Sequence, residues 1–178
     1  ERDYFISIGR LTRQKNFKFL IKSIAPFIKK NSEIKLYIFG EGEQKNEIIS
    51  LIGKLNLKNN IKLFPYKDNI YNYIHNSNGF ILSSLWEDPG FVLVEAAFLN
   101  KPILSSNCKN GPEEILDYGK NGILFKNNNE NSFRENFNIF YKLDQKSKLK
   151  YTLNAKKFVK KFGFFSHYKK LRNILDDL

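Results

Sequence analysis

Short apolar runs alternate with amphipathic helical segments along most of the sequence, and this alternation constrains the fold more than any other feature. The run at residues 4–8 reads Tyr-Phe-Ile-Ser-Ile and ends at Gly9. Apolar residues then recur at helical spacing, with lysines on the opposite face: Phe17, Leu20, Ile21, Ile24, Ala25 and Ile28. Repetition of this unit predicts an α/β fold, a Rossmann-like parallel sheet with helices on both faces.

Further apolar runs extend the pattern toward the C-terminus. We expect strands at 34–39, 61–64, 80–83, 102–105 and 123–125, and helices at 48–55, 70–75, 91–99 and 112–116. An exposed turn is expected at 126–129, and only helices after residue 130, one of them strongly basic. We therefore expect a single domain over residues 1–178, with a core of about residues 1–125 and C-terminal helices over about 130–178.

The length of 178 residues suits one well-cored domain and is short for two. No apolar run reaches the roughly 20 residues that cross a bilayer. The sequence contains no methionine and enters a strand almost at once, so we expect a fragment of a larger protein. The single cysteine, Cys108, has no partner within the chain, which fits a reducing, cytoplasmic location.

The net charge of +12 is concentrated near the C-terminus. Residues 142–172 contain 11 Lys or Arg against one acid, Asp144, whereas the rest of the chain has 19 basic and 17 acidic residues. A basic nucleic-acid-binding module is one interpretation, but no nucleic-acid motif is present and lysine far outnumbers arginine. Contact of this segment with an anionic membrane surface is another interpretation.

Loops that follow the strands are the expected ligand sites, because ligands bind beyond the carboxyl ends of parallel strands. After the first strand, Gly9 permits close backbone approach, and Arg10 and Lys15 place two cations beside the next helix. This arrangement suits a diphosphate, although both could be ordinary surface cations. After the second strand, residues 40–43 read Gly-Glu-Gly-Glu, whose acids would repel a pyrophosphate, so a tight turn is expected there.

Two glutamates, Glu87 and Glu95, lie eight positions apart across a loop and a helix start. Pro89 and Gly90 predict a turn, which leaves free amides at the helix start for an anion or a sugar oxygen. Glu95 lies on an otherwise apolar helix, where a carboxylate needs a partner. The alternatives are a solvated loop acid for Glu87 and a structural ion pair for Glu95.

Several motifs run in order over about residues 4–125: Gly9-Arg10-Leu11, Gln14-Lys15-Asn16, Phe39-Gly40-Glu41-Gly42, Glu87 with Glu95-Ala96, Pro102-Ile103, Gly111-Pro112 with Glu114-Ile115, and Gly119 with Asn121-Gly122. In this register they closely resemble the C-terminal domain of GT-B glycosyltransferases of family 4, the group 1 type. The resemblance implies the C-terminal half of a GT-B fold, with the acceptor-binding N-terminal domain absent from this fragment.

The resemblance also implies a function, that of a retaining hexosyltransferase. Such an enzyme transfers a sugar from a UDP-sugar or GDP-sugar to a glycan or lipid-linked acceptor, as in bacterial glycan or lipopolysaccharide biosynthesis. Arg10 and Lys15 would bind the donor diphosphate, and Glu95 the ribose hydroxyls. Glu87 would contact the transferred sugar as the candidate catalytic residue. Gly9, Gly90 and Phe91 would approach donor oxygens through their backbone.

Neither a metal ion nor a cofactor is expected, and the isolated fragment should bind donor without turnover. Many relatives carry Gly or Ser with Phe-Gly after the first glutamate, whereas this chain reads Asp88-Pro89-Gly90-Phe91, which we expect to alter the preferred sugar. Expected partners are the sugar nucleotide, the acceptor, the protein's own N-terminal domain and an anionic membrane at the cytoplasmic face, but no specific nucleic acid. A non-catalytic sugar-nucleotide-sensing domain of the same fold is an alternative.

Overall fold

A computed structural model describes residues 3–176 and contains one sheet of six strands in the order β3-β2-β1-β4-β5-β6. Every pairing between neighbouring strands is parallel. The strands are β1 (Phe5–Ile8), β2 (Leu36–Phe39), β3 (Ile61–Phe64), β4 (Gly79–Leu82), β5 (Ile103–Asn107) and β6 (Ile123–Lys126). The predicted α/β fold with a parallel sheet is confirmed.

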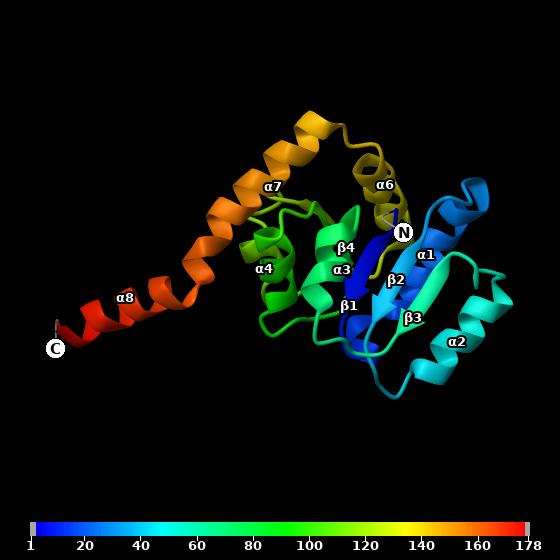
Figure 1. The fold of residues 1–178 in the computed structure, drawn as a ribbon, viewed down its shortest axis with the longest axis horizontal. Coiled ribbons are helices and arrows are strands. Elements are labelled where there is room, and N and C mark those ends of the chain that lie inside the picture. Colours follow the sequence, from blue (N-terminus) through cyan, green and yellow to red (C-terminus); the bar gives the residue numbers. More distant parts are fainter. Residues whose placement is uncertain (1–2, 177–178) are drawn as a thin grey trace.

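The helices follow the strands as the alternation predicted, with bounds within a few residues of those expected (Figure 1). Helices between strands are α1 (Phe17–Lys30), α2 (Lys45–Lys54), α3 (Ile70–Asn76), α4 (Phe91–Phe98) and α5 (Pro112–Ile115). The C-terminal helices are α6 (Glu130–Tyr141), α7 (Gln145–Val159) and α8 (Phe164–Asp176), and short 3-10 turns are η1 (Arg13–Lys15) and η2 (Lys160–Phe162). Among the described helices, none is long and apolar enough to cross a membrane.

Both faces of the sheet are buried because successive strand residues point to opposite sides. Phe5 belongs to the apolar layer that also contains side chains of α1, α2 and α6, whereas Ile6 belongs to the layer formed with α3, α4, α5 and α7. Phenylalanines fill the first layer: the rings of Phe5 and Phe137 meet edge to face at 5.5 Å, and Phe133 stacks on Phe137 at 5.6 Å. Much of the phenylalanine content of the sequence is therefore core material.

The strand order reverses between β1 and β4. From β1 the chain builds outward to β2 and β3, then returns so that β4 pairs with the free side of β1. The loops after β1 and β4 therefore leave the same edge of the sheet in different directions. Such a reversal is where open parallel sheets bind ligands, and it lies between residues 9–16 and 83–90.

Candidate functional site

The loop after β1 is held in place by the loop after β2. Gly9 donates its amide to the carbonyl of Phe39 (3.0 Å), and Leu11 donates to that of Glu41 (2.8 Å). A side chain at Gly40 would place its Cβ 1.9 Å from the carbonyl oxygen of Gly9. Residues 40–43, which were expected only to form a turn before α2, therefore also support the β1 loop. This support depends on Gly40 having no side chain.

The loop after β4 is fastened to the same β1 loop by three hydrogen bonds. Leu85 donates its amide to the carbonyl of Gln14 (2.8 Å), and the Gln14 side chain donates back to the carbonyl of Trp86 (3.0 Å). The hydroxyl of Ser83 donates to the carbonyl of Lys15 (2.8 Å). The two loops that flank the strand reversal thus form one connected unit.

Lys15 and Glu87 form an ion pair inside this unit. The Lys15 Nζ lies 2.6 Å from Oε1 and 2.8 Å from Oε2 of Glu87, whose side chain is only 3% exposed. The Ser84 hydroxyl donates a third hydrogen bond, to Oε1. A buried carboxylate is costly unless it is paired and hydrogen-bonded, and Glu87 has both an ion-pair partner and a hydrogen-bond donor. It is therefore no solvated loop acid.

The ammonium group of Lys15 retains capacity for a ligand. An ammonium has three N–H donors, and two of them point to the Glu87 oxygens. The stem of Lys15 runs over Gly9, where an added Cβ would lie 3.0–3.1 Å from the lysine side-chain carbons. Gly9 therefore leaves room for the lysine stem, and one donor of the partly buried ammonium group is left for an anion.

The start of α4 faces this ion pair with unused backbone donors. Gly90 precedes the helix with a φ of 85°, and an added Cβ there would lie 3.2–3.5 Å from side-chain atoms of Glu87. The amides of Gly90, Phe91 and Val92 donate no hydrogen bond to any described residue. Because a helix N-terminus carries partial positive charge, these amides form a site for an anion or a sugar oxygen.

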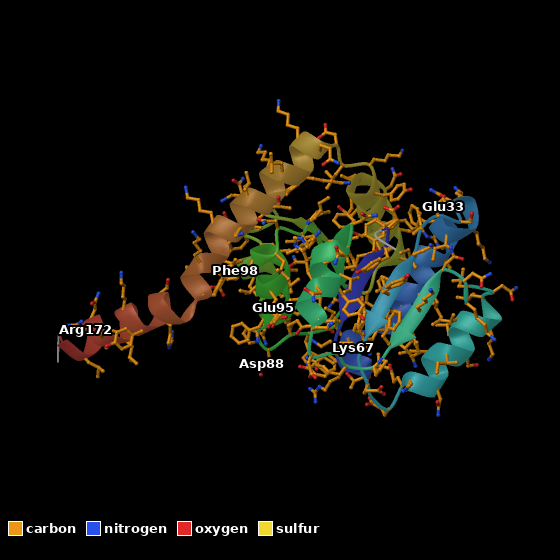
Figure 2. All side chains as sticks on the ribbon, viewed as in Figure 1. Glu33, Lys67, Asp88, Glu95, Phe98 and Arg172 are labelled. Atoms are coloured by element: carbon orange, nitrogen blue, oxygen red, sulfur yellow. The ribbon has the colours of Figure 1, made fainter. Side chains whose placement is uncertain are left out.

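The turn before α4 also depends on the loop after β5. An added Cβ at Gly111 would lie 1.9 Å from the carbonyl oxygen of Pro89, and the amide of Glu87 donates to the carbonyl of Lys109 (3.0 Å). The Asp88-Pro89 peptide is cis. Figure 2 shows Asp88 in this turn. Three loops from neighbouring strands therefore fix the position of Glu87.

Glu95 lies one turn further along α4, as labelled in Figure 2. Its side chain is half-buried and hydrogen-bonded to Tyr71 of α3, and burial raises the pKa of its carboxyl group while the Tyr71 hydrogen bond lowers it. No ion pair joins Glu95 to a described residue. The partner that the apolar helix required is thus a tyrosine hydroxyl, which the sequence pattern did not reveal.

Arg10 is placed differently from Lys15. Its side chain is exposed, and within residues 3–176 the guanidinium group forms no hydrogen bond or ion pair. Its loop is nevertheless fixed on both sides, by the loop after β2 and by the loop after β4. The structure therefore brings Gly9, Lys15, Glu87 and Gly90 into contact and leaves Arg10 free at the rim.

The turn after β6 contributes a residue that the sequence motifs did not indicate. The side-chain amide of Asn127 donates through Nδ2 to the carbonyl of Leu85 (2.9 Å). Its Oδ1 is buried without a hydrogen-bond partner among the described residues. Asn16 donates to the side chain of Asn128 (3.1 Å). The turn expected to be exposed is thus partly buried against the site. Its position at the carboxyl end of a strand is the signal that could have identified it.

The described residues offer neither a metal-ligand cluster nor an activated thiol at this site. Within the described part of the chain, no three side chains of His, Cys, Asp or Glu gather as ligands for a metal ion. Cys108 is buried, and burial raises the pKa of its thiol to about 11, so it is a poor nucleophile.

The model of the family described as glycosyl transferases group 1 matches residues 1–158. The chain belongs to this family. Among related proteins, an uncharacterised glycosyltransferase of Methanocaldococcus jannaschii is 44% identical over 135 residues, which cover 68% of this chain and 33% of that protein. The N-acetylgalactosamine-N,N'-diacetylbacillosaminyl-diphospho-undecaprenol 4-alpha-N-acetylgalactosaminyltransferase of Campylobacter jejuni is 30% identical over 159 residues, covering 89% of this chain and 42% of its own length. The chain thus spans less than half of either relative.

Solved GT-B glycosyltransferase structures share the fold at lower identity. A glycosyltransferase from Rickettsia africae superposes with a TM-score of 0.87 at 19% identity, over 98% of this chain and 47% of that one. Anabaena HepE in complex with UDP-glucose gives 0.85 at 21%, over 98% and 49%. The C-terminal domain of a group 1 family protein from Francisella tularensis gives 0.75 at 19%, over 88% and 84%. The sequence-based assignment to group 1 GT-B glycosyltransferases is confirmed.

Proposed function

We propose that this chain is the donor-binding domain of a retaining, family 4 glycosyltransferase that transfers a hexose from a nucleoside diphosphate sugar to a glycan or lipid-linked acceptor. The observation that carries the proposal is the buried Lys15–Glu87 ion pair at the strand reversal, beside the open amides of α4. The HepE structure with UDP-glucose supports it as a relative of the same fold with such a donor bound.

Three sources of positive charge belong to the loops at the strand reversal, where we propose that the diphosphate binds. Arg10 is exposed and unpaired among the described residues, Lys15 has one unused donor, and the amides at the start of α4 are open. Charge-assisted hydrogen bonds and a helix N-terminus both favour phosphate oxygens. Glu95, further along α4, would accept hydrogen bonds from the ribose hydroxyls, with Tyr71 holding its carboxylate.

Transfer breaks the bond between the anomeric carbon and the diphosphate oxygen, and the electron pair leaves with the diphosphate. The acceptor hydroxyl forms the new bond to the anomeric carbon and loses its proton. The main electrostatic task is therefore to stabilise charge that develops on the leaving group. In our scheme Arg10, Lys15 and the α4 amides do this without a metal ion. Glu87, fixed by Lys15 and Ser84, holds a carboxylate beside the positive charge that develops on the sugar.

The acceptor side belongs to the part of the protein outside this chain. Because the chain spans 33% and 42% of the two relatives described above, we propose that a preceding N-terminal domain binds the acceptor. Residues 1–178 alone would then bind donor without turnover. We place the protein in the cytoplasm, where sugar nucleotides are available, with a role in bacterial glycan or lipopolysaccharide biosynthesis.

The test compares UDP with 2′,3′-dideoxy-UDP by calorimetry on wild type and Glu95→Gln. A hydrogen bond to a charged group contributes about 1.5–3 kcal/mol, so the variant should bind UDP roughly ten- to a hundredfold more weakly. It should bind the dideoxy nucleotide as the wild type does, because the partner hydroxyls are missing. Glu135→Gln, an exposed carboxylate on α6, is the control. An equal loss for both nucleotides would contradict the ribose assignment, and GDP forms of both should be compared if UDP does not bind.

A further inference from the structure

The outward side of α7 exposes leucines in a strongly basic surface. Leu149 and Leu153 lie one helical turn apart and are 58% and 53% exposed. The opposite side of the helix is buried through Thr152, Ala155 and Val159. Figure 1 shows α7 at the edge of the domain beside α4. The helix thus exposes two adjacent leucines to water while it buries smaller residues. This arrangement needs an explanation.

Lysines border these leucines, and no acid accompanies them. Lys146, Lys150 and Lys157 are exposed, and none forms an ion pair with a described residue. At about 100° per residue, these three lie beside Leu153 around the helix axis. The sequence of α7 contains no Asp or Glu. In Figure 2, side chains that end in a nitrogen atom point away from the domain along this helix.

Two hollows adjoin the lysines on the side away from the leucines. They lie between α7 and the loop before β6, have volumes of about 480 and 430 Å³, and are both lined by Lys120 and Asn154. Lys150 lines the first and Lys157 the second. Lys120 is in an exposed ion pair with Asp117 at 3.3 Å, so Lys150 and Lys157 supply the unpaired charge. The hollows can accommodate anionic groups next to the row of lysines.

We propose that this surface, made of Leu149, Leu153, Lys146, Lys150 and Lys157, binds an anionic phospholipid bilayer. The leucines enter the boundary between headgroups and acyl chains, and the lysines contact lipid phosphates. A nucleic acid duplex would use the lysines but leave the leucines without an apolar partner. A second copy of the chain would bring like charges together. The surface shares no residue with the proposed donor site, so the two can be tested separately.

Co-sedimentation with vesicles tests the charge component. The chain should bind vesicles of phosphatidylcholine with phosphatidylglycerol more tightly than phosphatidylcholine alone, and this preference should decline with salt. Each lysine near an anionic bilayer contributes about 1 kcal/mol, so Lys150→Gln with Lys157→Gln should weaken binding roughly 25-fold at low salt. The control removes equal charge on α1 and α2, with Lys22→Gln and Lys54→Gln, and should change binding little. Equal losses in the two pairs would overturn the proposal, because only net charge would then matter.

The leucines provide the test that separates a membrane from a nucleic acid. Leu149→Gln with Leu153→Gln should weaken binding to anionic vesicles by about tenfold or more, because the apolar contact is lost. The matched control is Ile49→Gln with Ile139→Gln, which removes apolar side chains of 47% and 54% exposure from α2 and α6. The leucine pair should not alter binding to duplex DNA. If DNA binds more tightly than the vesicles, or the leucine pair has no effect on vesicle binding, the proposal is wrong.

Discussion

Lys15 and Glu87, 72 positions apart in the sequence, meet in an ion pair with the Lys15 Nζ 2.6 Å from Oε1 and 2.8 Å from Oε2. The pair joins the loop after β1 to the loop after β4, at the point where the strand order reverses. Because the carboxylate is buried, neither residue can be changed without affecting the other. Donor binding and local stability are therefore coupled at this position.

The coupling predicts a non-additive double-mutant cycle. Lys15→Met leaves the Glu87 carboxylate buried and uncompensated, so the free energy of unfolding should fall by about 3–5 kcal/mol. Adding Glu87→Gln should restore a large part of this loss, since the buried charge is gone. Urea unfolding measures both.

The control cycle uses Lys18 and Glu47, whose ion pair has the same 2.6 Å separation but side chains that are 39% and 60% exposed. Exposed pairs contribute about 0–1 kcal/mol, so Lys18→Met and Glu47→Gln should be nearly additive. Additive losses in the Lys15 and Glu87 cycle as well would show that the buried pair is not coupled as described.

Gly40 should be intolerant of even a methyl group. The Cβ of Gly40→Ala would lie 1.9 Å from the Gly9 carbonyl oxygen, a backbone atom, so the β1 loop must move. We expect a loss of stability of a few kcal/mol and weaker nucleotide binding. Gly53→Ala in α2 is the control, because its nearest neighbour is the flexible end of Lys58 at 3.5 Å. That change should be neutral or stabilise by up to about 1 kcal/mol. Equal effects of Gly40→Ala and Gly53→Ala on stability would show that the close contact between Gly40 and Gly9 does not matter.

The sequence predicted the sheet and the helices because apolar periodicity encodes burial directly, as with the α1 residues Phe17 to Ile28 that form one buried face. It also placed Lys15 and Glu87 in loops at the carboxyl edge. It could not pair them, because that pairing depends on β4 returning beside β1, a long-range choice that local patterns do not record. The support that Gly40 gives to Gly9 was missed for the same reason.

The partner of Glu95 was also beyond the sequence. An apolar helix face indicates that a carboxylate needs a partner, but it does not say whether a cation or a hydroxyl from another helix provides it. Tyr71 meets Glu95 because α3 and α4 lie side by side on one face of the sheet. Such contacts follow from packing between helices.

Glu95 should make stability depend on pH in a defined direction. Burial raises its pKa above the ordinary value of 4.5, so the folded state binds this proton more tightly than the unfolded state. The contribution of Glu95 is therefore fully favourable below that ordinary value and is lost as pH rises through the folded pKa. The unfolding free energy of wild type minus that of Glu95→Gln should therefore fall as the pH rises above 4.5.

Tyr71→Phe sharpens the pH measurement. The Tyr71 hydrogen bond lowers the pKa of Glu95, so its removal should move the fall in stability to higher pH. The same substitution in a Glu95→Gln background should not change the pH profile. A flat difference between wild type and Glu95→Gln across the range would show that Glu95 is not perturbed by burial.

Arg10 offers a clean test of binding because it is exposed and lacks a partner among the described residues. Arg10→Ala should weaken binding of UDP or GDP by about ten- to a hundredfold, the usual effect of losing a charge-assisted hydrogen bond. Its unfolding free energy should stay within about 0.5 kcal/mol of wild type. Arg134→Ala, which removes a guanidinium from an exposed pair on α6, should leave nucleotide affinity unchanged. Unchanged affinity in Arg10→Ala would remove Arg10 from the site.

We propose that the sugar nucleotide donor binds at the strand reversal between β1 and β4. Amide chemical shifts of the isotope-labelled chain, recorded during titration with UDP, GDP and their sugar conjugates, test it most directly. With at least one of these ligands, we expect the largest shifts at Gly9, Gly90 and Phe91, and little change in the groove between α1 and α2 around Lys22 and Lys54. Shifts confined to that groove, or no shifts with any of these ligands at millimolar concentration, would show that the donor does not bind at the strand reversal.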